Sequence, residues 1–507
     1  MKGTVLSKKF ASRPLALAVA ASLYLGSGTA VADTTEDLLN MLKAKGVLTK
    51  DEYDVLTKRV QTEKKQQREE AKKAAVEESQ KAAKAAMAEG GKKPDPTDVK
   101  VSFKNGFVIQ TADGKNSLAI KGRIQADNRD YLDGDGKNTD VFELRRAYLY
   151  AMGKVFDKYE FMMLGNFSGT PQAVFWYMNA HWWDEAQLEF GQFRFPFGQN
   201  EWTSSRNIDF MERALPMQFV TGIDRGVMLH GLPLSGMYYG LAGVNGGLRT
   251  NAGLNGSGLS ENNDTDGKGF IGHLSFNAAE PLGHKDNIYY LGASYSIGTE
   301  ATDTSPPTNS PNYQLQSQTE GRGLVFFRTE NFNENEVDLW RAGVSNTLSF
   351  GPIKFAGEYV HNTYSGKSKA GLHFNRDIDA YYVSTNWLIT GEKYGHFFGK
   401  NGAFGIIEPK QNFDMAGGWG AWELGLRYSH LDATDFNASN PVGTGVLRSG
   451  FANSADAWTV GLKWIVNPNT RFLLNYIRTA FNQPVKVNAT TTTDVENALN
   501  FRTQLDF

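Results

Sequence analysis

Arginine and lysine side chains recur on the polar positions of several predicted strands and on one long loop. The candidates for a binding role are Lys121, Arg123, Arg145, Arg194, Arg206, Arg213, Arg225, Arg427 and Arg502. A guanidinium presents a planar fork of donors that matches two oxygens of a phosphate or carboxylate, so closely spaced members of this set could bind an oxyanion. Several moderate sites in series release an anion more readily than one tight site. The alternative is that each arginine pairs with a carboxylate such as Glu143, Glu423 or Asp506.

The elements that must position these side chains are β-strands. From Val101 to the last residue, apolar and polar residues alternate with a period of two, which predicts strands with one apolar face. Sixteen strands are predicted, at 118–129, 141–153, 157–167, 173–184, 186–195, 225–233, 237–246, 268–278, 287–298, 337–350, 353–364, 379–390, 421–432, 455–466, 470–481 and 497–507. Short connections alternate with long polar ones, as in a closed outer-membrane barrel. The connection 391–420 is an exception, because it is long and falls among the short turns.

Composition favours the same architecture. The mean hydropathy is −0.42, and no run of about 18 uncharged apolar residues follows residue 32, which excludes a bundle of membrane-spanning helices. Aromatic residues cluster at predicted strand ends, for example at Trp182 and Trp183 and at Tyr381 and Tyr382, as in the girdles of a membrane barrel. The sequence therefore predicts an all-β transmembrane barrel of sixteen antiparallel strands. The alternative is a secreted β-sandwich or solenoid.

Strand alternation also assigns faces to the candidates. Lys121, Arg123, Arg427 and Arg502 fall on inward positions, whereas the parity of Arg194 is ambiguous near Gly191. Arg145 shares the polar parity of Glu143, but Arg146 shares the parity of Phe142 and would point at lipid. An arginine at the middle of the bilayer would cost about 2–4 kcal/mol. We therefore expect that Arg146 lies near the interface or that a β-bulge redirects it.

Several segments together resemble the phosphate-selective porins O and P. They are Lys121–Asp127, Leu144–Ala147, Phe190–Phe197, Thr203–Arg206, Phe210–Arg213, Trp387–Glu392 and Gly420–Tyr428, and they span most of 101–507 in order. The resemblance implies a sixteen-stranded trimeric porin in which the third long loop folds inward and an arginine ladder draws anions through the narrowed pore. The loop at about 196–224, which carries Arg206 and Arg213, would be that constriction, and Arg225 begins the strand that leaves it.

The first 100 residues differ from the rest. Basic residues, an apolar stretch and the sequence Ala30-Val31-Ala32 predict a signal peptide at 1–32, cleaved after Ala32, with a short membrane anchor as the alternative. Residues 33–89 are rich in Lys, Glu, Gln and Ala and predict a helical arm, either a coiled coil between subunits or a solvated charged arm. Residues 90–100 are expected to form a linker, and 101–507 to form the barrel. A partner of the arm would lie in the periplasm or cell wall.

Other kinds of function find little support. The segment 133–140 is similar to a calcium loop, but Lys137 occupies a ligand position and Asn138 replaces the required glycine, so a turn is expected instead. There is no cysteine, no H-E-x-x-H, no G-x-S-x-G and no phosphate-binding loop, so no enzyme activity, metal site or cofactor is expected. No basic patch suggests nucleic acid.

These observations lead to one function and two alternatives. The chain is expected to be a trimeric outer-membrane porin in lipid, through which small anions such as phosphate diffuse passively without a cofactor. One alternative is a general porin of the same fold with weak or no anion selectivity. The other is a barrel that serves as an anchor or adhesin, with the helical arm as its interaction module. Residues 101–507 carry 34 basic and 41 acidic residues, so an anion preference must be local.

Overall fold

The computed structural model describes residues 98–103, 106–132, 139–220, 222–244, 268–301, 315–330, 336–367, 371–437 and 447–507. The chain divides into two compact units, Met1–Asp95 and Pro96–Phe507, and every described residue belongs to the second. The expected signal peptide, the helical arm at 33–89, most of the linker at 90–100 and most of the segment 133–140 lie outside the described residues. Within the described part of the chain, no helix is long and apolar enough to cross a membrane.

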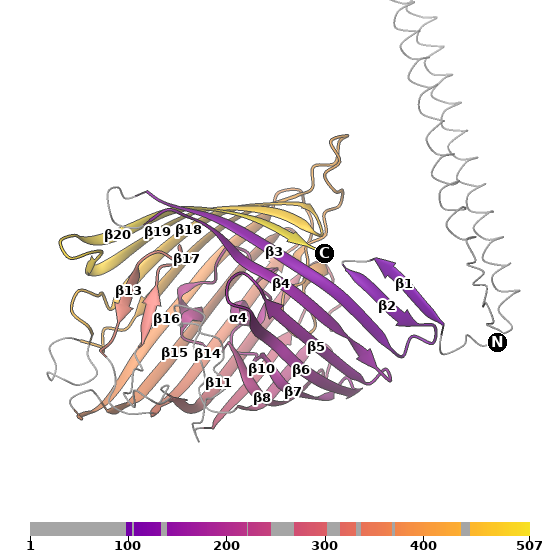
Figure 1. Cartoon of the computed structure of the whole chain (residues 1–507), viewed down its shortest axis with the longest axis horizontal. Coiled ribbons are helices and arrows are strands. Elements are labelled where there is room, and N and C mark those ends of the chain that lie inside the picture. Colours follow the sequence, from indigo (N-terminus) through magenta and orange to yellow (C-terminus); the bar gives the residue numbers. More distant parts are fainter. Residues whose placement is uncertain are drawn as a thin grey trace, which may run out of the picture. The chain divides into compact units, whose positions relative to one another are not determined.

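In the described residues, sixteen antiparallel strands close into a barrel (Figure 1). Each strand pairs with the next in chain order, and β20 returns to pair with β3 through Arg502 and Asp127. The strands are β3 (Ser117–Tyr131), β4 (Val141–Val155), β5 (Tyr159–Asn166), β6 (Gln172–Trp183), β7 (Ala186–Arg194), β8 (Ile223–Gly231), β9 (Met237–Val244), β10 (Gly269–Asn277), β11 (Ile288–Ala301), β14 (Glu336–Phe350), β15 (Ile353–Lys367), β16 (His373–Leu388), β17 (Ala421–Asp432), β18 (Ser454–Asn467), β19 (Thr470–Lys486) and β20 (Thr492–Asp506). The predicted sixteen-stranded barrel is confirmed.

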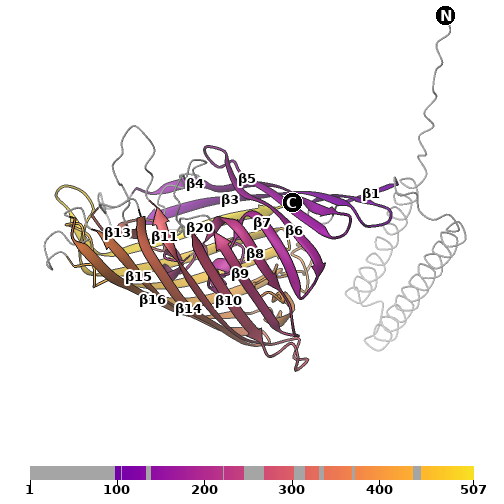
Figure 2. The ribbon, with the colours of Figure 1, turned by 90° about the horizontal axis from the view of Figure 1, so that it is seen from below.

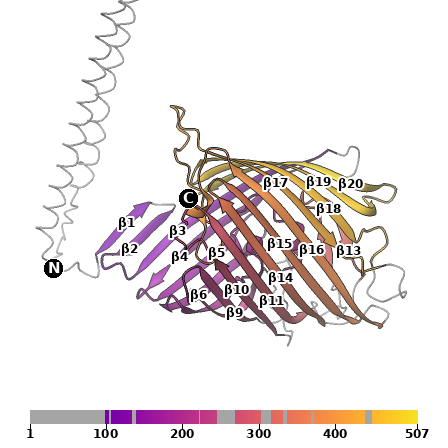
Figure 3. The same ribbon diagram turned by 180° about the vertical axis from the view of Figure 1, so that it is seen from behind.

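The two faces of the wall follow the alternation of the sequence. On β18, Trp458 and Val460 are about half exposed on the outside, whereas Thr459 and Lys463 are buried inside. The strands run obliquely around the barrel, as Figure 3 shows from behind. Because exposed apolar side chains recur around the outer wall and charged ones around the inner wall, the barrel has a lipid-compatible exterior and a polar interior.

A β-bulge on β4 resolves the position of Arg146. The register with β3 shifts so that Gln125 faces Arg146 while the next residue, Ala126, faces Leu144. Arg145 is therefore the extra residue on β4, and the two arginines can both lie inside the barrel. Arg146 is 7% exposed and donates to Gln125 Oε1 at 2.8 Å. The bulge, rather than a position near the interface, keeps this arginine away from lipid.

A hairpin that the sequence did not predict precedes the barrel. It consists of β1 (Val99–Phe103) and β2 (Phe107–Thr111), so β1 begins within the segment predicted as a linker. β2 pairs with the start of β3, beyond the last residue of β20 (Figures 1 and 2). Gly106, just before β2, has a φ of 120°, which other residues rarely adopt. A Cβ added at this position would lie only 2.6 Å from the carbonyl oxygen of Ile120, so the hairpin requires glycine here.

Three connections fold into the barrel. The inward loop, defined as residues 195–222, contains α4 (Gln199–Trp202) and η1 (Leu215–Gln218). The connection between β11 and β14 carries a second, two-stranded sheet of β12 (Gln316–Gln318) and β13 (Val325–Arg328). The connection 389–420, with η2 (Tyr394–Phe397), also turns inward, which accounts for its unexpected length among the short turns. Buried apolar side chains of these segments pack against the inner wall.

Candidate functional site

The inward loop is held at its start by a carboxylate on the opposite wall. Glu358 on β15 accepts hydrogen bonds from the backbone N–H groups of Gln199 at 2.8 Å and Asn200 at 2.6 Å. The first N–H groups of a helix have no carbonyl partner within the helix, and no side chain of the loop itself caps α4. The Tyr382 hydroxyl donates to the same carboxylate at 2.8 Å. The wall therefore caps the short helix and fixes the entry of the loop into the barrel.

An aromatic side chain fixes the middle of the loop. The ring of Phe210 lies over Gly425 and Gly461, two glycines that face each other on β17 and β18. A Cβ at either glycine would come within 3.0 Å of that ring. The guanidinium carbon of Arg427 lies 4.5 Å from the ring centroid, and its Nη1 donates to the carbonyl of Glu212. The predicted pore residue Arg427 is thus a buried support for the loop, paired with Glu320.

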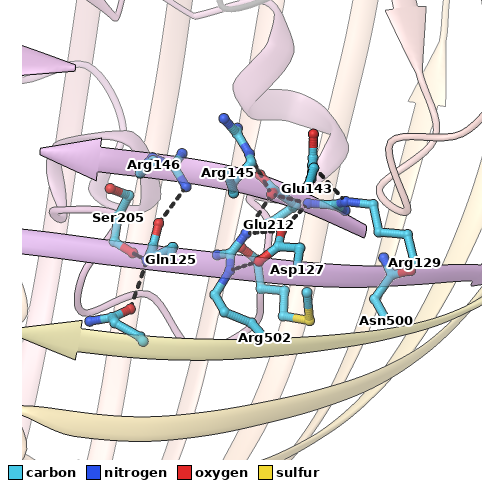
Figure 4. Close-up of polar contacts among 12 residues, drawn as sticks. Gln125, Asp127, Arg129, Glu143, Arg145, Arg146, Ser205, Glu212, Asn500 and Arg502 are labelled. Carbon is cyan, nitrogen blue, oxygen red and sulfur yellow. Dashed lines mark hydrogen bonds and ion pairs between the residues drawn. The ribbon is translucent and has the colours of Figure 1, made fainter. Parts of the chain in front are cut away.

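The tip of the loop carries Glu212, which is shared by three arginines (Figure 4). Its Oε1 lies 2.9 Å from Arg129, 3.1 Å from Arg145 and 2.8 Å from Arg502. Arg502 also forms a fork-shaped pair with Asp127, at 2.6 and 2.7 Å. Burial alone would raise the pKa of Glu212, but the charges of Arg145, Arg502 and Arg129 outweigh it and hold the pKa well below its usual range. Glu212 is therefore a charged anchor.

A second group of arginines surrounds the side-chain carboxylate of Asp506, the last residue of β20. Asp506 pairs with Arg123 at 2.9 Å and with Arg206 of the inward loop at 3.0 Å. Arg123 also donates to Ser205 Oγ at 3.1 Å, and Arg471 donates to the carbonyl oxygen of Arg206 at 2.9 Å. Three guanidinium groups thus gather around one carboxylate, and of the three only Arg206 keeps a partly exposed side chain.

A third group lies at the start of the inward loop and includes the last residue of β7. Glu201 pairs with Arg194 at 3.3 Å and with Arg213 at 2.8 Å. Arg213 also donates to the carbonyl oxygens of Asn200 at 3.0 Å and Thr203 at 2.8 Å, which fixes the direction of its side chain. Arg194, whose parity was ambiguous from the sequence, faces the interior, with its guanidinium carbon 5.7 Å from the Phe175 ring centroid.

Together the three groups contain eight arginines and five carboxylates, namely Asp127, Glu143, Glu201, Glu212 and Asp506. Four arginines retain side chains that are 15–20% exposed to the interior, namely Arg145, Arg194, Arg206 and Arg213. The other predicted arginines of the inner wall, Arg123, Arg427 and Arg502, are buried and support the loop. Lys121 lies two residues before Arg123 on the same face of β3 and is partly buried. A positive excess therefore exists inside the barrel, beside the inward loop.

Arg225 is the predicted pore residue that the structure places elsewhere. It lies in a groove with Trp176, Phe190 and Val227, which are exposed on the outer wall, and its Nε donates to Gln192 Oε1 at 3.2 Å. On β8 it shares the parity of Val227. Arg225 was expected to line the pore because it begins the strand that leaves the inward loop. Its face was not assigned by alternation, and the structure places it on the outer wall instead.

Two arginines outside the predicted set join the Glu212 group. Arg129 shares the inward parity of Arg123 on β3, and it pairs with Asp127 on the same strand, with Glu143 on β4 and with Glu212 of the inward loop. Arg322 lies in the turn between β12 and β13, with a φ of 61°. The charge of Arg145 and burial lower the pKa of Arg322 to about 10, which indicates that positive charges crowd there. No strand pattern could have selected Arg322, because it lies in a long loop.

The connection 389–420 fills the space on one side of the inward loop. Trp202 and Gln199 donate to the carbonyl oxygens of Asn401 at 3.0 Å and Gly402 at 3.1 Å. Lys354 pairs with Asp209 of the inward loop, and its Nζ lies 4.1 Å from the Phe404 ring centroid. On the other side, beside β3 to β9, a cavity of about 460 Å³ remains. Arg123 and Arg194 line this cavity, so it lies next to two of the arginine groups.

The described residues contain no group of three or more His, Asp or Glu side chains that could hold a metal ion. A closed sixteen-stranded barrel, with a polar interior narrowed by an inward loop, defines the class of outer-membrane porins. The family model of phosphate-selective porins O and P matches residues 118–507. The chain belongs to that family, which indicates an outer-membrane channel rather than an enzyme.

Individual relatives are distant. The chain is 22% identical over 417 residues to Porin O of Pseudomonas aeruginosa, an alignment that covers 76% of this chain and 87% of that protein. Among solved structures, it is similar to the outer membrane channel DcaP of Acinetobacter baumannii, with 10% identity, a TM-score of 0.46, and coverage of 78% of this chain and 99% of that one. A porin refined at 1.8 Å gives 9% identity, a TM-score of 0.40, and coverage of 77% and 100%.

Proposed function

We propose that this outer-membrane porin prefers small anions, with phosphate as the substrate suggested by its family. The observation that carries the proposal is the positive excess beside the inward loop, where Arg145, Arg194, Arg206 and Arg213 remain partly exposed. Guanidinium groups match the oxygens of phosphate in geometry and charge. Because each of the four also contacts a carboxylate, each binds an anion only moderately, which allows release.

The local excess must outweigh an acidic barrel. Residues 101–507 carry 34 basic and 41 acidic residues, but charges at the outer rims are screened within about 10 Å at 0.1 M salt. A narrow passage depends mainly on the charges that line it, since interactions there are less screened. Three of the four partly exposed arginines, Arg194, Arg206 and Arg213, lie on or directly before the inward loop, which projects into the proposed path.

The same proposal includes passive transport by a homotrimer in the outer membrane. The concentration gradient of the anion is the only driving force, and no cofactor takes part. The trimer follows from the family resemblance, and size measurement of the detergent-solubilised protein tests it. A porin of the same fold with weak anion preference is a second candidate, favoured by the shared carboxylates Glu201, Glu212 and Asp506. In that case the arginines serve only to hold the loop.

Phosphate block of chloride current separates the two candidates. Single channels in planar bilayers carry chloride, and added phosphate interrupts the current if it dwells at the arginines. We expect Arg206→Ala and Arg213→Ala each to raise the half-blocking phosphate concentration about fivefold to tenfold, the loss of roughly one charge-assisted contact. Arg225→Ala, on the outer wall, is the matched control and should leave the block unchanged. Equal block in wild type and both variants would refute the proposed role of these arginines.

A further inference from the structure

The 460 Å³ cavity beside the inward loop has opposite charges at its two ends. Arg194, whose side chain is partly exposed, and the more deeply buried Arg123 contribute the positive end. Glu160 and Glu189 contribute the negative end, near the short turn that follows Gly231. Two carboxylates in the lining would repel phosphate, so phosphate binding alone does not explain their presence.

The neighbours of the two carboxylates are an amide and two histidines. Glu160 accepts from Asn179 Nδ2 at 3.1 Å and lies 3.2 Å from His181 Nδ1. Glu189 lies 3.4 Å from His230 Nε2. Among the described residues, no lysine or arginine lies within ion-pair distance of either carboxylate. This pair of carboxylates is therefore open to an external cation, in contrast to Glu201, Glu212 and Asp506, which arginines already contact.

Antiparallel pairing brings these groups to one level of the wall. Glu160 on β5 is registered with Asn179 on β6, and Asn179 with Glu189 on β7. Gln187 on β7 is registered with His230 on β8, and Asn179 Nδ2 donates to Gln187 Oε1 at 2.8 Å. A hydrogen-bonded band thus crosses four adjacent strands. Such a band holds the carboxylates in place, as a binding site requires.

The positive end is also fixed. Arg123 lies 5.6 and 5.7 Å from the ring centroids of Tyr148 and Tyr150, and Arg194 lies 5.7 Å from that of Phe175. Between the two ends, the wall is aromatic. Trp202 stacks on Tyr238 with a centroid separation of 6.0 Å, and Tyr177 also lines the cavity. Aromatic faces attract apolar chains and ammonium groups but contribute little binding energy to a phosphate ion.

We propose that this cavity binds linear zwitterionic solutes, with a carboxylate or phosphate at the arginine end and an ammonium at Glu160 and Glu189. Arg194 and Glu189 are five residues apart on β7, a backbone separation of roughly 17 Å. The two side chains occupy part of that distance, so the solute must hold its charges several bonds apart. The inference rests on the proposed function only in placing the cavity on the conducting path.

The test compares three solutes of similar length. We expect 6-aminohexanoate to half-block the chloride current of the wild-type channel at about tenfold lower concentration than hexanoate or hexylammonium, because it alone satisfies both ends. The comparison uses the wild-type protein, so it does not depend on the folding of a variant. Equal half-blocking concentrations for 6-aminohexanoate and hexanoate would overturn the proposal.

Variants assign the effect to the negative end. Glu189→Gln combined with Glu160→Gln should bring 6-aminohexanoate to the level of hexanoate. Glu185→Gln removes one carboxylate charge from the adjacent exposed turn, outside the cavity, and should retain the tenfold difference. A tenfold difference that survives the double substitution would refute this assignment. The chloride-to-potassium permeability ratio, measured in the same bilayers, reports separately on the anion preference.

Discussion

Replacing Glu212 by glutamine tests the link between loop anchoring and selectivity. The carboxylate is shared by Arg129, Arg145 and Arg502, and its side chain is 13% exposed. Glutamine keeps the shape and one acceptor oxygen but removes the charge. We expect two consequences, a weaker attachment of the inward loop and a more positive interior.

The size of each effect follows from the geometry. Removing one partner of a buried ion pair costs about 3–5 kcal/mol, so the barrel should unfold at a lower temperature or denaturant concentration. For an anion that passes at about 7 Å, with an effective dielectric constant of about 40, loss of the negative charge is worth about 1 kcal/mol. Chloride gains and potassium loses about this much, so the chloride-to-potassium permeability ratio should rise about thirtyfold.

Reversal potentials across a bilayer with a potassium chloride gradient measure this ratio. Glu185→Gln in the exposed turn is the control, since it removes the same charge far from the loop, and its ratio should equal that of the wild type. Glu143→Gln should show a smaller rise, because Glu143 contacts only Arg129 and its side chain is 34% exposed. The reasoning is refuted if Glu212→Gln, in an intact barrel, leaves the ratio unchanged or shifts it toward potassium.

Three further predictions concern the loop and the arm. Gly461→Ala should displace the Phe210 ring, which lies 2.8 Å from the added Cβ, and destabilise the barrel by about 1–3 kcal/mol in denaturant titration, whereas Gly243→Ala, with no atom within 4 Å, should not. The pKa of Glu212 is lower in the folded protein than its usual value of 4.5. The stability that the ionised Glu212 contributes should therefore be complete above pH 4.5 and be lost as the pH falls through the lowered pKa. A loss of barrel stability between pH 8 and pH 5 that Glu212→Gln abolishes would contradict this. Deleting residues 33–89 should leave the single-channel conductance unchanged, because the lumen residues described above lie in 98–507, and loss of the trimer on native gels would support the coiled-coil interpretation.

The strands could be predicted because each carries its own signal. Alternation along a single segment identifies a strand and its faces, so all sixteen were located. The exceptions are local irregularities that alternation cannot detect. The bulge at Arg145 redirects Arg146, and the loop boundary before Arg225 left the face of that residue unassigned. The hairpin β1–β2 depends on Gly106 and on a free edge of β3, neither of which a strand pattern specifies.

The arrangement of charges could be predicted only in part. Pairing of arginines with Glu143 and Asp506 was anticipated as the alternative to anion binding, and both pairs are present. Glu212 and Glu201 were not anticipated, since their partners come from distant segments that the closed barrel brings together. The contrast between buried arginines that support the loop and partly exposed ones that can meet an anion depends on side-chain packing, which alternation does not encode.

The sign of the reversal potential of the wild-type channel tests the central claim most directly. The claim is that a few partly exposed arginines beside the inward loop set the selectivity of a barrel whose overall charge is acidic. Under a potassium chloride gradient, the account predicts a potential that shows chloride to be more permeant than potassium, together with a reduced chloride current when phosphate is added. A potential that shows potassium to be more permeant, with no response to phosphate, would contradict it.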